Sequence, residues 1–223
     1  MARLSPLAGR AADAPGTAPV PDAPGTGPVP EETGGGDTGR MEFLCHHRDR
    51  PGSVQLRDAL VEAHWSYMDG FAAAMIARGP TLADDGDTPT GSVHALDLPD
   101  PAAARAFAFD EPNYQAGVYR DVLLRRWRNV LGRTMWQFPG GRTGGNRYLV
   151  LGLGAGEPAD DVPPDAADEL VGYGPLLSDD GARWLGTAAL LRAPDPDAAR
   201  AVLTADRYAS IEVHNWQFGG RPE

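Results

Sequence analysis

The chain has 223 residues, of which 42% are hydrophobic, enough for one large core or two small ones. Its net charge of −11 at pH 7 disfavours a nucleic-acid partner, and the lack of any run of about 18 apolar residues disfavours a membrane span. Its single cysteine, Cys45, excludes an intramolecular disulfide, and with no secretory segment at the start we expect a cytoplasmic protein.

Residues 1–40 are rich in Pro, Gly and Ala and contain a near repeat of APGT followed by Val-Pro. Such a segment offers too little apolar surface to offset the entropy of ordering it, so we expect a disordered tail. Two interpretations of Met41 remain open. It either follows a genuine tail or is itself the initiator of translation.

The folded part is predicted to begin at Met41, where MEFLCHH is typical of a strand. Ser53 follows a Pro-Gly turn and predicts a helix N-terminus. Apolar or aromatic side chains then recur every four residues on one helix face, at Leu56, Leu60, His64 and Met68. We expect this helix to end before Gly79.

A hairpin is expected next, with a short strand at 79–82, a turn at 84–87 and a second strand at 90–98. Asp100 followed by Pro101 predicts the start of a second helix. A last strand is expected at 118–127. The resulting order, βαββαβ, is that of a ferredoxin-like α+β unit.

The sequence contains an internal repeat. Residues 79–106 align with 174–201 at a constant offset of 95, with 15 identities in 28 positions. Unrelated sequences of this composition would share roughly two or three. We therefore expect a tandem duplication, with units at 41–138 and 147–223 and a linker at 139–146.

The second unit is expected to be degenerate. Its counterpart of the first helix is reduced to DAADELV, about two turns at 165–171, and contains no histidine. The motif WQF occurs at 136–138 and again at 216–218, which suggests that both units close with the same segment.

Several segments in a fixed order carry a family resemblance, namely FLCHHRDRPGS, AHWSYM, ARGPTLADDG, TGSVHALDL, EPNYQAGVY and RRWRNVLG. Together they resemble the YciI family, also described as YCII-related. The resemblance implies a dimeric α+β barrel in which two βαββαβ units pack sheet against sheet. A tandem copy would form this barrel as a pseudo-dimer within one chain.

The resemblance also implies an acid/base pair of a His and an Asp, with a Ser nearby, and one relative removes HCl from a chlorinated hydroxyquinone. By position the His is His64, the Asp is Asp84 or Asp85, and the Ser is Ser92. Where relatives have Asp-Pro-Tyr, this chain has Glu-Pro-Asn. Glu111 is therefore a candidate substrate-binding carboxylate.

Each candidate also has a structural interpretation. His64 lies on an apolar helix face and could be a hydrogen-bonded core histidine. Turns select Asp for backbone bonding, and the repeat keeps Asp-Asp in a unit without a histidine, so at least one of Asp84 and Asp85 is expected to be structural. Ser92 is replaced by Thr187 in the second unit, where a hydroxyl could serve the backbone alone.

His46 and His47 are adjacent on a strand and should point to opposite faces, so they cannot both bind one metal. We expect no metal and no cofactor, and assign His47 to substrate binding. A mononuclear site formed by one of them with His64 and a carboxylate is the alternative.

The favoured function is a lyase or isomerase that uses His64 and a carboxylate on a small cyclic or aromatic substrate. The alternatives are a non-catalytic module that binds a small ligand or a protein, and a structural or regulatory partner in a biosynthetic pathway. We expect a monomer or weak homo-oligomer with one functional pocket, near His64. The corresponding pocket of the second unit should be filled or closed.

Overall fold

A computed structural model describes residues 40–154 and 167–221. The predicted tail at 1–40 lies outside these residues except for Arg40. The first half consists of β1 (Met41–Asp49), α1 (Val54–Ala59), α2 (Val61–Asp69), η1 (Ala72–Ala74), β2 (Met75–Leu82), β3 (Pro89–Leu98), α3 (Pro101–Phe109), α4 (Pro112–Gln115) and β4 (Tyr119–Trp127). The remainder consists of η2 (Met135–Gln137), β5 (Arg147–Leu153), β6 (Leu170–Leu177), β7 (Trp184–Arg192), α5 (Pro196–Arg200), η3 (Ala205–Arg207) and β8 (Ser210–Trp216).

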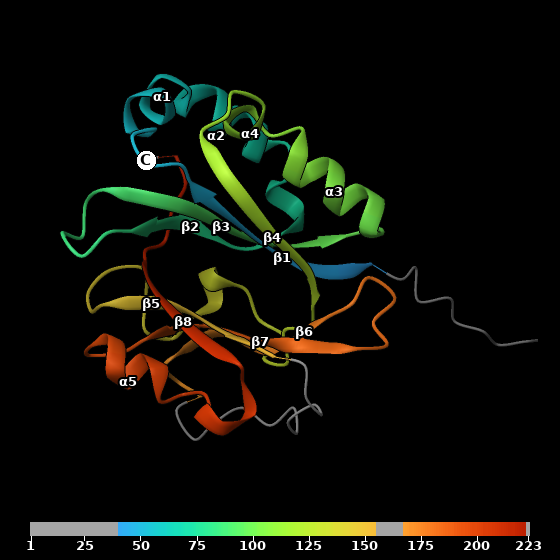
Figure 1. The fold of residues 1–223 in the computed structure, drawn as a ribbon, viewed down its shortest axis with the longest axis vertical. Coiled ribbons are helices and arrows are strands. Elements are labelled where there is room, and N and C mark those ends of the chain that lie inside the picture. The colour runs from blue at the N-terminus through green and yellow to red at the C-terminus, as the bar shows by residue number, and fades with distance from the viewer. Residues whose placement is uncertain (1–39, 155–166, 222–223) are drawn as a thin grey trace, which may run out of the picture. The chain divides into compact units, whose positions relative to one another are not determined.

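The strands form one closed barrel in the order β1-β3-β2-β8-β5-β7-β6-β4. The first four strands are ordered 4-1-3-2, and the last four repeat this order as 8-5-7-6. The two halves join through two short antiparallel contacts, β2 with β8 and β4 with β6. Figure 1 shows the two sheets facing each other, with α1–α4 outside the first sheet and α5 outside the second. The α+β class and the barrel agree with the prediction.

The alternation of side chains along β1 separates the barrel interior from the helix layer. Leu44 packs in the interior, between the two sheets, with apolar residues from both halves. Phe43 and Cys45 pack on the other face, against α2 and α3. A third cluster lies between the second sheet and α5. The interior cluster joins the halves, because neither sheet can bury its inner face alone.

The helix starts predicted after Ser53 and at Asp100 are confirmed, since α1 begins at Val54 and α3 at Pro101. The Asp100 carboxylate accepts a hydrogen bond from the Ala103 amide at 2.8 Å, and Asp195 does the same for Ala198 in the second half. The capping group and the proline that follows it thus start both helices in the same way. No helix within the described residues is long and apolar enough to cross a membrane.

Two predictions of helices were wrong. The long helix expected to end before Gly79 is broken into α1, α2 and η1, and β2 already begins at Met75. Met75, Ile76 and Ala77 are buried, as expected of a strand covered on both faces. The second wrong prediction is the helix at 165–171, of which the structure describes residues 167–171. Residues 167–169 form a turn and β6 starts at Leu170, so these residues form no helix.

The two WQF motifs are not structurally equivalent, which corrects the prediction of a shared closing segment. Trp136 lies in η2 and is 44% exposed, whereas Trp216 ends β8 and is 1% exposed. The counterpart of Trp216 is Trp127. Trp216 pairs with Thr81 of β2, and Trp127 pairs with Leu176 of β6. Leu176 is the equivalent of Thr81 in the repeat, 95 residues later.

Two glycines allow the halves to cross closely. A Cβ atom on Gly79 would lie 1.8 Å from the Gln217 carbonyl oxygen, and one on Gly174 would lie 1.8 Å from the Arg128 carbonyl oxygen. No side chain fits at such a distance from a backbone atom. Each sheet therefore depends on a glycine of β2 or β6 at the point where the other half passes over it.

We predict that Gly79→Ala and Gly174→Ala each lower the free energy of unfolding by about 1–3 kcal/mol, because the backbones must separate. Urea denaturation measures this. Gly70→Ala is the matched control, since Gly70 has helical backbone angles and its Cβ would lie 3.2 Å from the nearest carbonyl oxygen. Loss in the control equal to that in the two crossing variants would contradict this account of the junction.

Candidate active site

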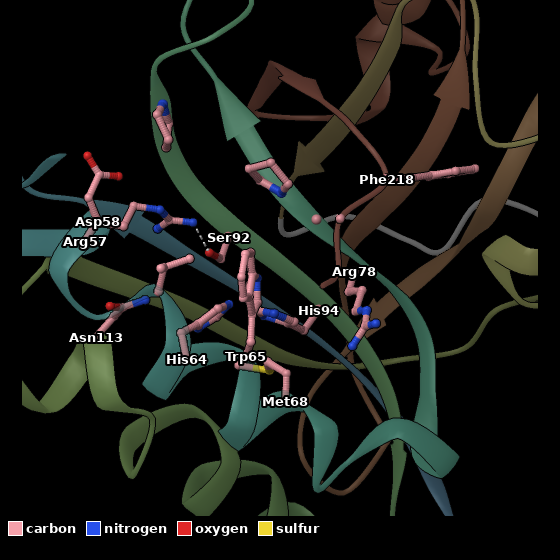
Figure 2. Close-up of a pocket in the computed structure, with 16 residues that line it drawn as sticks. Arg57, Asp58, His64, Trp65, Met68, Arg78, Ser92, His94, Asn113 and Phe218 are labelled. Carbon is pink, nitrogen blue, oxygen red and sulfur yellow. Dashed lines mark hydrogen bonds between the residues drawn. The ribbon is translucent and has the colours of Figure 1, made fainter. Parts of the chain in front are cut away.

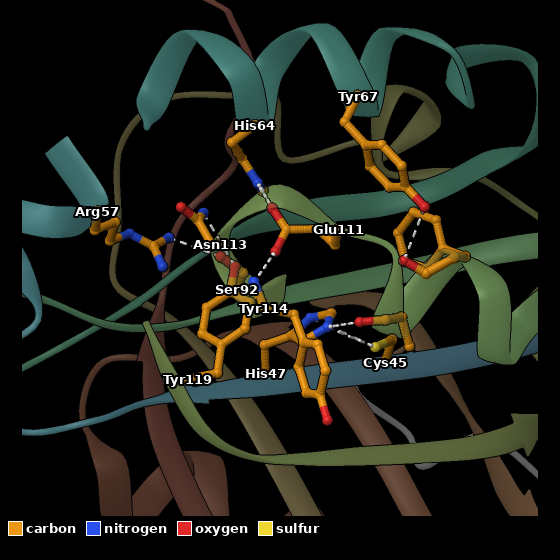
Figure 3. Close-up of polar contacts among 12 residues, drawn as sticks. Cys45, His47, Arg57, His64, Tyr67, Ser92, Glu111, Asn113, Tyr114 and Tyr119 are labelled. Carbon is orange, nitrogen blue, oxygen red and sulfur yellow. Dashed lines mark hydrogen bonds and ion pairs between the residues drawn. The ribbon is translucent and has the colours of Figure 1, made fainter. Parts of the chain in front are cut away.

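His64 and Glu111 form a close polar pair between two helices. His64 lies in α2, and Glu111 is the residue that caps the N-terminus of α4. The His64 Nδ1 atom is 2.6 Å from Glu111 Oε1 (Figure 3). The other carboxylate oxygen, Oε2, accepts a hydrogen bond from the Tyr114 amide at 2.8 Å. Both oxygens are thus bonded, and the carboxylate is fixed in orientation.

The surroundings keep Glu111 ionised. Its side chain is fully buried, and burial alone would raise its pKa. The hydrogen bond and charge of His64, together with the amides of Tyr114 and Asn113, outweigh burial and lower the pKa of Glu111. An ionised carboxylate can only accept hydrogen bonds, so the proton between the pair belongs to His64 Nδ1.

His64 of this pair lines a cavity of about 280 Å³, which is at the small end for ligand pockets, and Glu111 lies buried behind it. His64, Trp65 and Met68 line it from α2, as Figure 2 shows. The strands β2 and β3 supply a second wall, and Phe218 with the two glycines after it supply a third. Both halves of the chain therefore build the pocket, although both of its histidines, His64 and His94, come from the first half.

Two ion pairs of Arg221, from the C-terminal segment, hold the wall formed by α2 in place. Arg221 contacts Glu62 at 2.7 Å and Asp69 at 3.1 Å, and both carboxylates belong to α2. Its guanidinium also lies 5.4 Å from the centre of the Trp65 ring. Figure 1 shows the C-terminal segment leaving β8 and ending near the helices of the first half.

Ser92 lies in the pocket wall, as predicted, but its hydroxyl is already engaged. The oxygen accepts a hydrogen bond from Arg57 at 2.7 Å (Figure 3). Arg57 also contacts Asp49 at 3.1 Å. Burial raises the pKa of Asp49 more than Arg57 lowers it. The hydrogen-bonded chain from Asp49 through Arg57 to Ser92 fixes the hydroxyl, so Ser92 can hold a substrate atom.

Asp84 and Asp85 do not pair with His64, which corrects the predicted partner. Asp85 is bonded within its own turn, where its carboxylate accepts from the Thr88 amide at 2.9 Å and from the Thr88 hydroxyl at 2.6 Å. Asp84 contacts Asn215 at 3.5 Å, at the junction with β8. Neither lines the pocket. The carboxylate that contacts His64 is instead that of Glu111, for which the sequence had suggested substrate binding.

The two histidines of β1 point to opposite faces, as predicted. His47 faces the helices, where its Nε2 is 2.8 Å from the Ala108 carbonyl oxygen and its ring stacks on Tyr119 at 4.4 Å. It is fully buried, burial lowers its pKa to about 4, and it does not line the pocket. The structure therefore offers no support for the predicted contact of His47 with substrate. His46 faces the barrel interior, beside His214.

Sequence reasoning missed His94. It lies in β3 with 2% exposure, lines the pocket, and its ring centre is 5.7 Å from that of His64. Burial and the charges of His64 and His47 lower its pKa well below the usual value, which keeps the ring neutral at pH 7. The family resemblance had singled out Ser92, and strand alternation places the residue two positions later on the same face, so the signal for His94 was present.

No cluster of three or more His, Cys, Asp or Glu side chains within residues 40–154 and 167–221 has a geometry that would hold a metal ion. The arrangement can instead move a proton. His64 has one ring nitrogen bonded to an ionised carboxylate, and the residue lines a small, partly apolar cavity.

Comparisons with known proteins place the first half in a family. The profile of the YCII-related domain matches residues 41–128. An uncharacterised protein of Haemophilus influenzae is 28% identical over 97 residues, which are 40% of this chain and 99% of that protein. A solved structure of 5-chloro-2-hydroxyhydroquinone dehydrochlorinase from Burkholderia phenoliruptrix, in complex with 2,5-dihydroxybenzoquinone, is 30% identical. That match covers 42% of this chain and 99% of the dehydrochlorinase, with a TM-score of 0.38.

Looser structural matches extend over both halves. An anthrone oxidase-like protein is 10% identical with a TM-score of 0.48, and the match covers 81% of this chain and 91% of that protein. The Haemophilus protein and the dehydrochlorinase each align over 99% of their own length, but these alignments cover only 40% and 42% of this chain. On the profile match and the 30% identity over a complete relative, the chain belongs to the YCII-related family.

Proposed function

We propose that this protein is a lyase or isomerase in which His64 transfers a proton to or from a small cyclic or aromatic substrate. The observation that carries the proposal is the 2.6 Å contact between the buried Glu111 carboxylate and His64, a residue that lines a 280 Å³ pocket. A pocket of this size accommodates a single ring with a few substituents.

The hydrogen bond fixes the chemical role of each ring nitrogen. Because Nδ1 carries the proton shared with Glu111, the neutral ring has its lone pair on Nε2. That nitrogen can take a proton from a substrate O–H or C–H group. The electron pair of the broken bond then forms a new double bond and expels a leaving group such as chloride, or shifts along the ring. The imidazolium, stabilised by Glu111, returns its proton to solvent or to another position of the substrate.

We also propose that the barrel arose by tandem duplication, with units at 41–138 and 147–223 joined by 139–146. The repeated strand order and the paired caps at Asp100 and Asp195 support this. In the second half, Thr187 takes the position of Ser92, and its hydroxyl is 2.9 Å from that of Tyr208. The Tyr208 ring also lies against Gly152, within 2.6 Å of where a Cβ would be. A tyrosine thus fills space beside the second sheet, and we expect a single active site.

The experiment that tests the proposal asks whether the wild-type protein turns anything over. Chlorinated and unchlorinated hydroxyhydroquinones are incubated with it, and chloride release and deuterium uptake from D₂O are measured. Either signal above the uncatalysed rate supports proton-transfer chemistry. Ligands that bind, as seen by calorimetry, with neither signal would instead favour the non-catalytic binding module.

A further inference from the structure

Arg78 stands out among the arginines that line the pocket or lie close to it. Arg57 contacts Asp49, Arg48 contacts Asp121 and Glu212, and Arg221 contacts two carboxylates of α2. Arg78, in β2, has no carboxylate partner within the described residues. Its Nε atom is buried and makes no hydrogen bond there. A guanidinium without a carboxylate partner can pair with the negatively charged oxygen of a ligand.

The backbone around Arg78 holds the side chain in place. The Arg78 carbonyl accepts a hydrogen bond from the Gly219 amide at 3.0 Å, which ties β2 to the C-terminal segment. A Cβ on Gly220 would lie 2.7 Å from an Arg78 guanidinium nitrogen, so the absence of a side chain at 220 leaves room for the guanidinium. The central carbon of the Arg78 guanidinium, Cζ, also lies 6.0 Å from the centre of the Trp136 ring.

The charged groups of the pocket are separated. Asp58 and Arg57 lie at one end in Figure 2 and Arg78 at the other, with His64 and Trp65 between them. Arg57 is neutralised by Asp49, and His94 is kept neutral by burial. The end of the pocket at Arg78 thus has an uncompensated positive charge in a chain whose net charge is −11. An acidic protein repels small anions unless its pocket offers such a group.

The remaining walls favour a flat ring. The Trp65, His94 and Phe218 rings line the cavity together with Met68 and Pro80. Aromatic side chains bind planar ligands through their faces and edges, and the polar groups then fix the orientation. The sequence counterpart of Arg78 in the second half is Tyr173, so this charge is specific to the first.

We propose that the substrate is a monocyclic organic anion, an aromatic carboxylate or an ionised ring hydroxyl, whose negatively charged oxygen binds Arg78 while its reacting group faces His64. Arg78 is then the residue that determines specificity. This proposal rests on the proposed function, because it gives the substrate class for the His64 site. It makes a separate statement about binding, which holds whether or not turnover has been seen.

The test compares benzoate with its neutral analogue benzamide as probes, using titration calorimetry or NMR. The wild-type protein should bind benzoate at least about tenfold more tightly than benzamide. Arg78→Met should reduce this preference to less than about twofold, whereas Arg78→Lys should retain part of it. Arg125→Met is the matched control, since Arg125 is exposed on β4 and bonds only its neighbouring carbonyl among the described groups. It should leave the preference unchanged.

Arg78→Gln, with a thermal melt of each variant, separates loss of the charge from loss of the fold. Equal affinities of the wild-type protein for the two probes, no benzoate binding up to about 10 mM, or an unchanged preference in folded Arg78→Met or Arg78→Gln would overturn the proposal. His64→Gln should keep the preference for benzoate even where it abolishes turnover. A preference that depends on Arg78, in a protein that releases no chloride and exchanges no deuterium, would support the anion site and refute the catalytic role.

Discussion

Replacing His64 with glutamine is expected to lower kcat by about 10²- to 10⁴-fold, the usual contribution of a positioned acid/base group. The glutamine amide can still donate a hydrogen bond to Glu111, so the buried carboxylate is not left unpaired. It cannot transfer a proton. Stability should therefore change by no more than about 1–3 kcal/mol while turnover is lost, and steady-state kinetics with a thermal melt measure both.

Two further variants make this result specific. Glu111→Gln keeps the size of the side chain but removes the charge that orients and stabilises the imidazolium, and it should lower kcat by about 10²-fold or more. His214→Gln is the control, because His214 lies on β8 beside Glu212 and does not line the pocket. It should keep kcat within about twofold. Full activity of His64→Gln, or loss of activity in His214→Gln alone, would show that the site is assigned to the wrong residue.

Acidification is expected to destabilise the fold steeply between about pH 6.5 and pH 5. Three histidines are almost completely buried: His46, His47 and His94. Burial lowers the pKa of all three, to about 4 for His47 and well below the usual value for the other two. In the folded protein these three histidines therefore stay unprotonated in this range, whereas in the unfolded chain they take up protons near pH 6.5.

The sign follows from proton linkage. Since the unfolded state binds more protons, the free energy of unfolding falls as pH falls, by about 1.4 kcal/mol per pH unit for each such histidine. Three of them give about 4 kcal/mol per unit in this window. Urea unfolding at a series of pH values measures the slope. A free energy of unfolding that is flat from pH 6.5 to 5 would show that these rings are protonated in the folded protein.

His46 offers a variant that tests the cause. Both of its ring nitrogens are buried without a hydrogen-bond partner among the described groups, at the end of the barrel interior next to His214. His46→Leu should remove about 1.4 kcal/mol per pH unit from the slope and be at least as stable as wild type at pH 5. Thr81→Val is the control, because it alters another buried polar residue near this position without changing any titrating group.

The fold was predictable where local signals and the repeat agreed. The Asp-Pro helix starts and the alternation in β1 are short-range features, and the offset of 95 implied equivalent units. The start of β2 was missed because Met75–Arg78 continues a run that also suits a helix, and only pairing with β3 selects the strand. The counterpart of Trp216 was missed because the WQF motif recurs at a place where the chain has already left the sheet.

The site was predictable in part. Helical spacing placed His64 toward the sheet, but its partner Glu111 is 47 residues away, and only the packing of α2 against α4 brings the two together. Periodicity carries no information on such a contact. Asp84 and Asp85 were assigned by their position in the family resemblance, but the Asp85 carboxylate accepts hydrogen bonds from backbone amides of its own turn. The wall formed by Phe218 and its following glycines depends on the closure of the barrel, which no local pattern shows.

The central claim is that His64 keeps a proton on Nδ1 for Glu111 and presents an unprotonated Nε2 to the pocket. Long-range ¹H–¹⁵N correlation NMR of the ¹⁵N-labelled protein, with His64→Gln to assign the ring, reports the tautomer of the neutral imidazole directly. The account predicts the Nδ1–H tautomer in wild type and a loss of that preference in Glu111→Leu. A neutral ring with its proton on Nε2 in the wild-type protein would contradict it, because the pocket would then face a donor and no base.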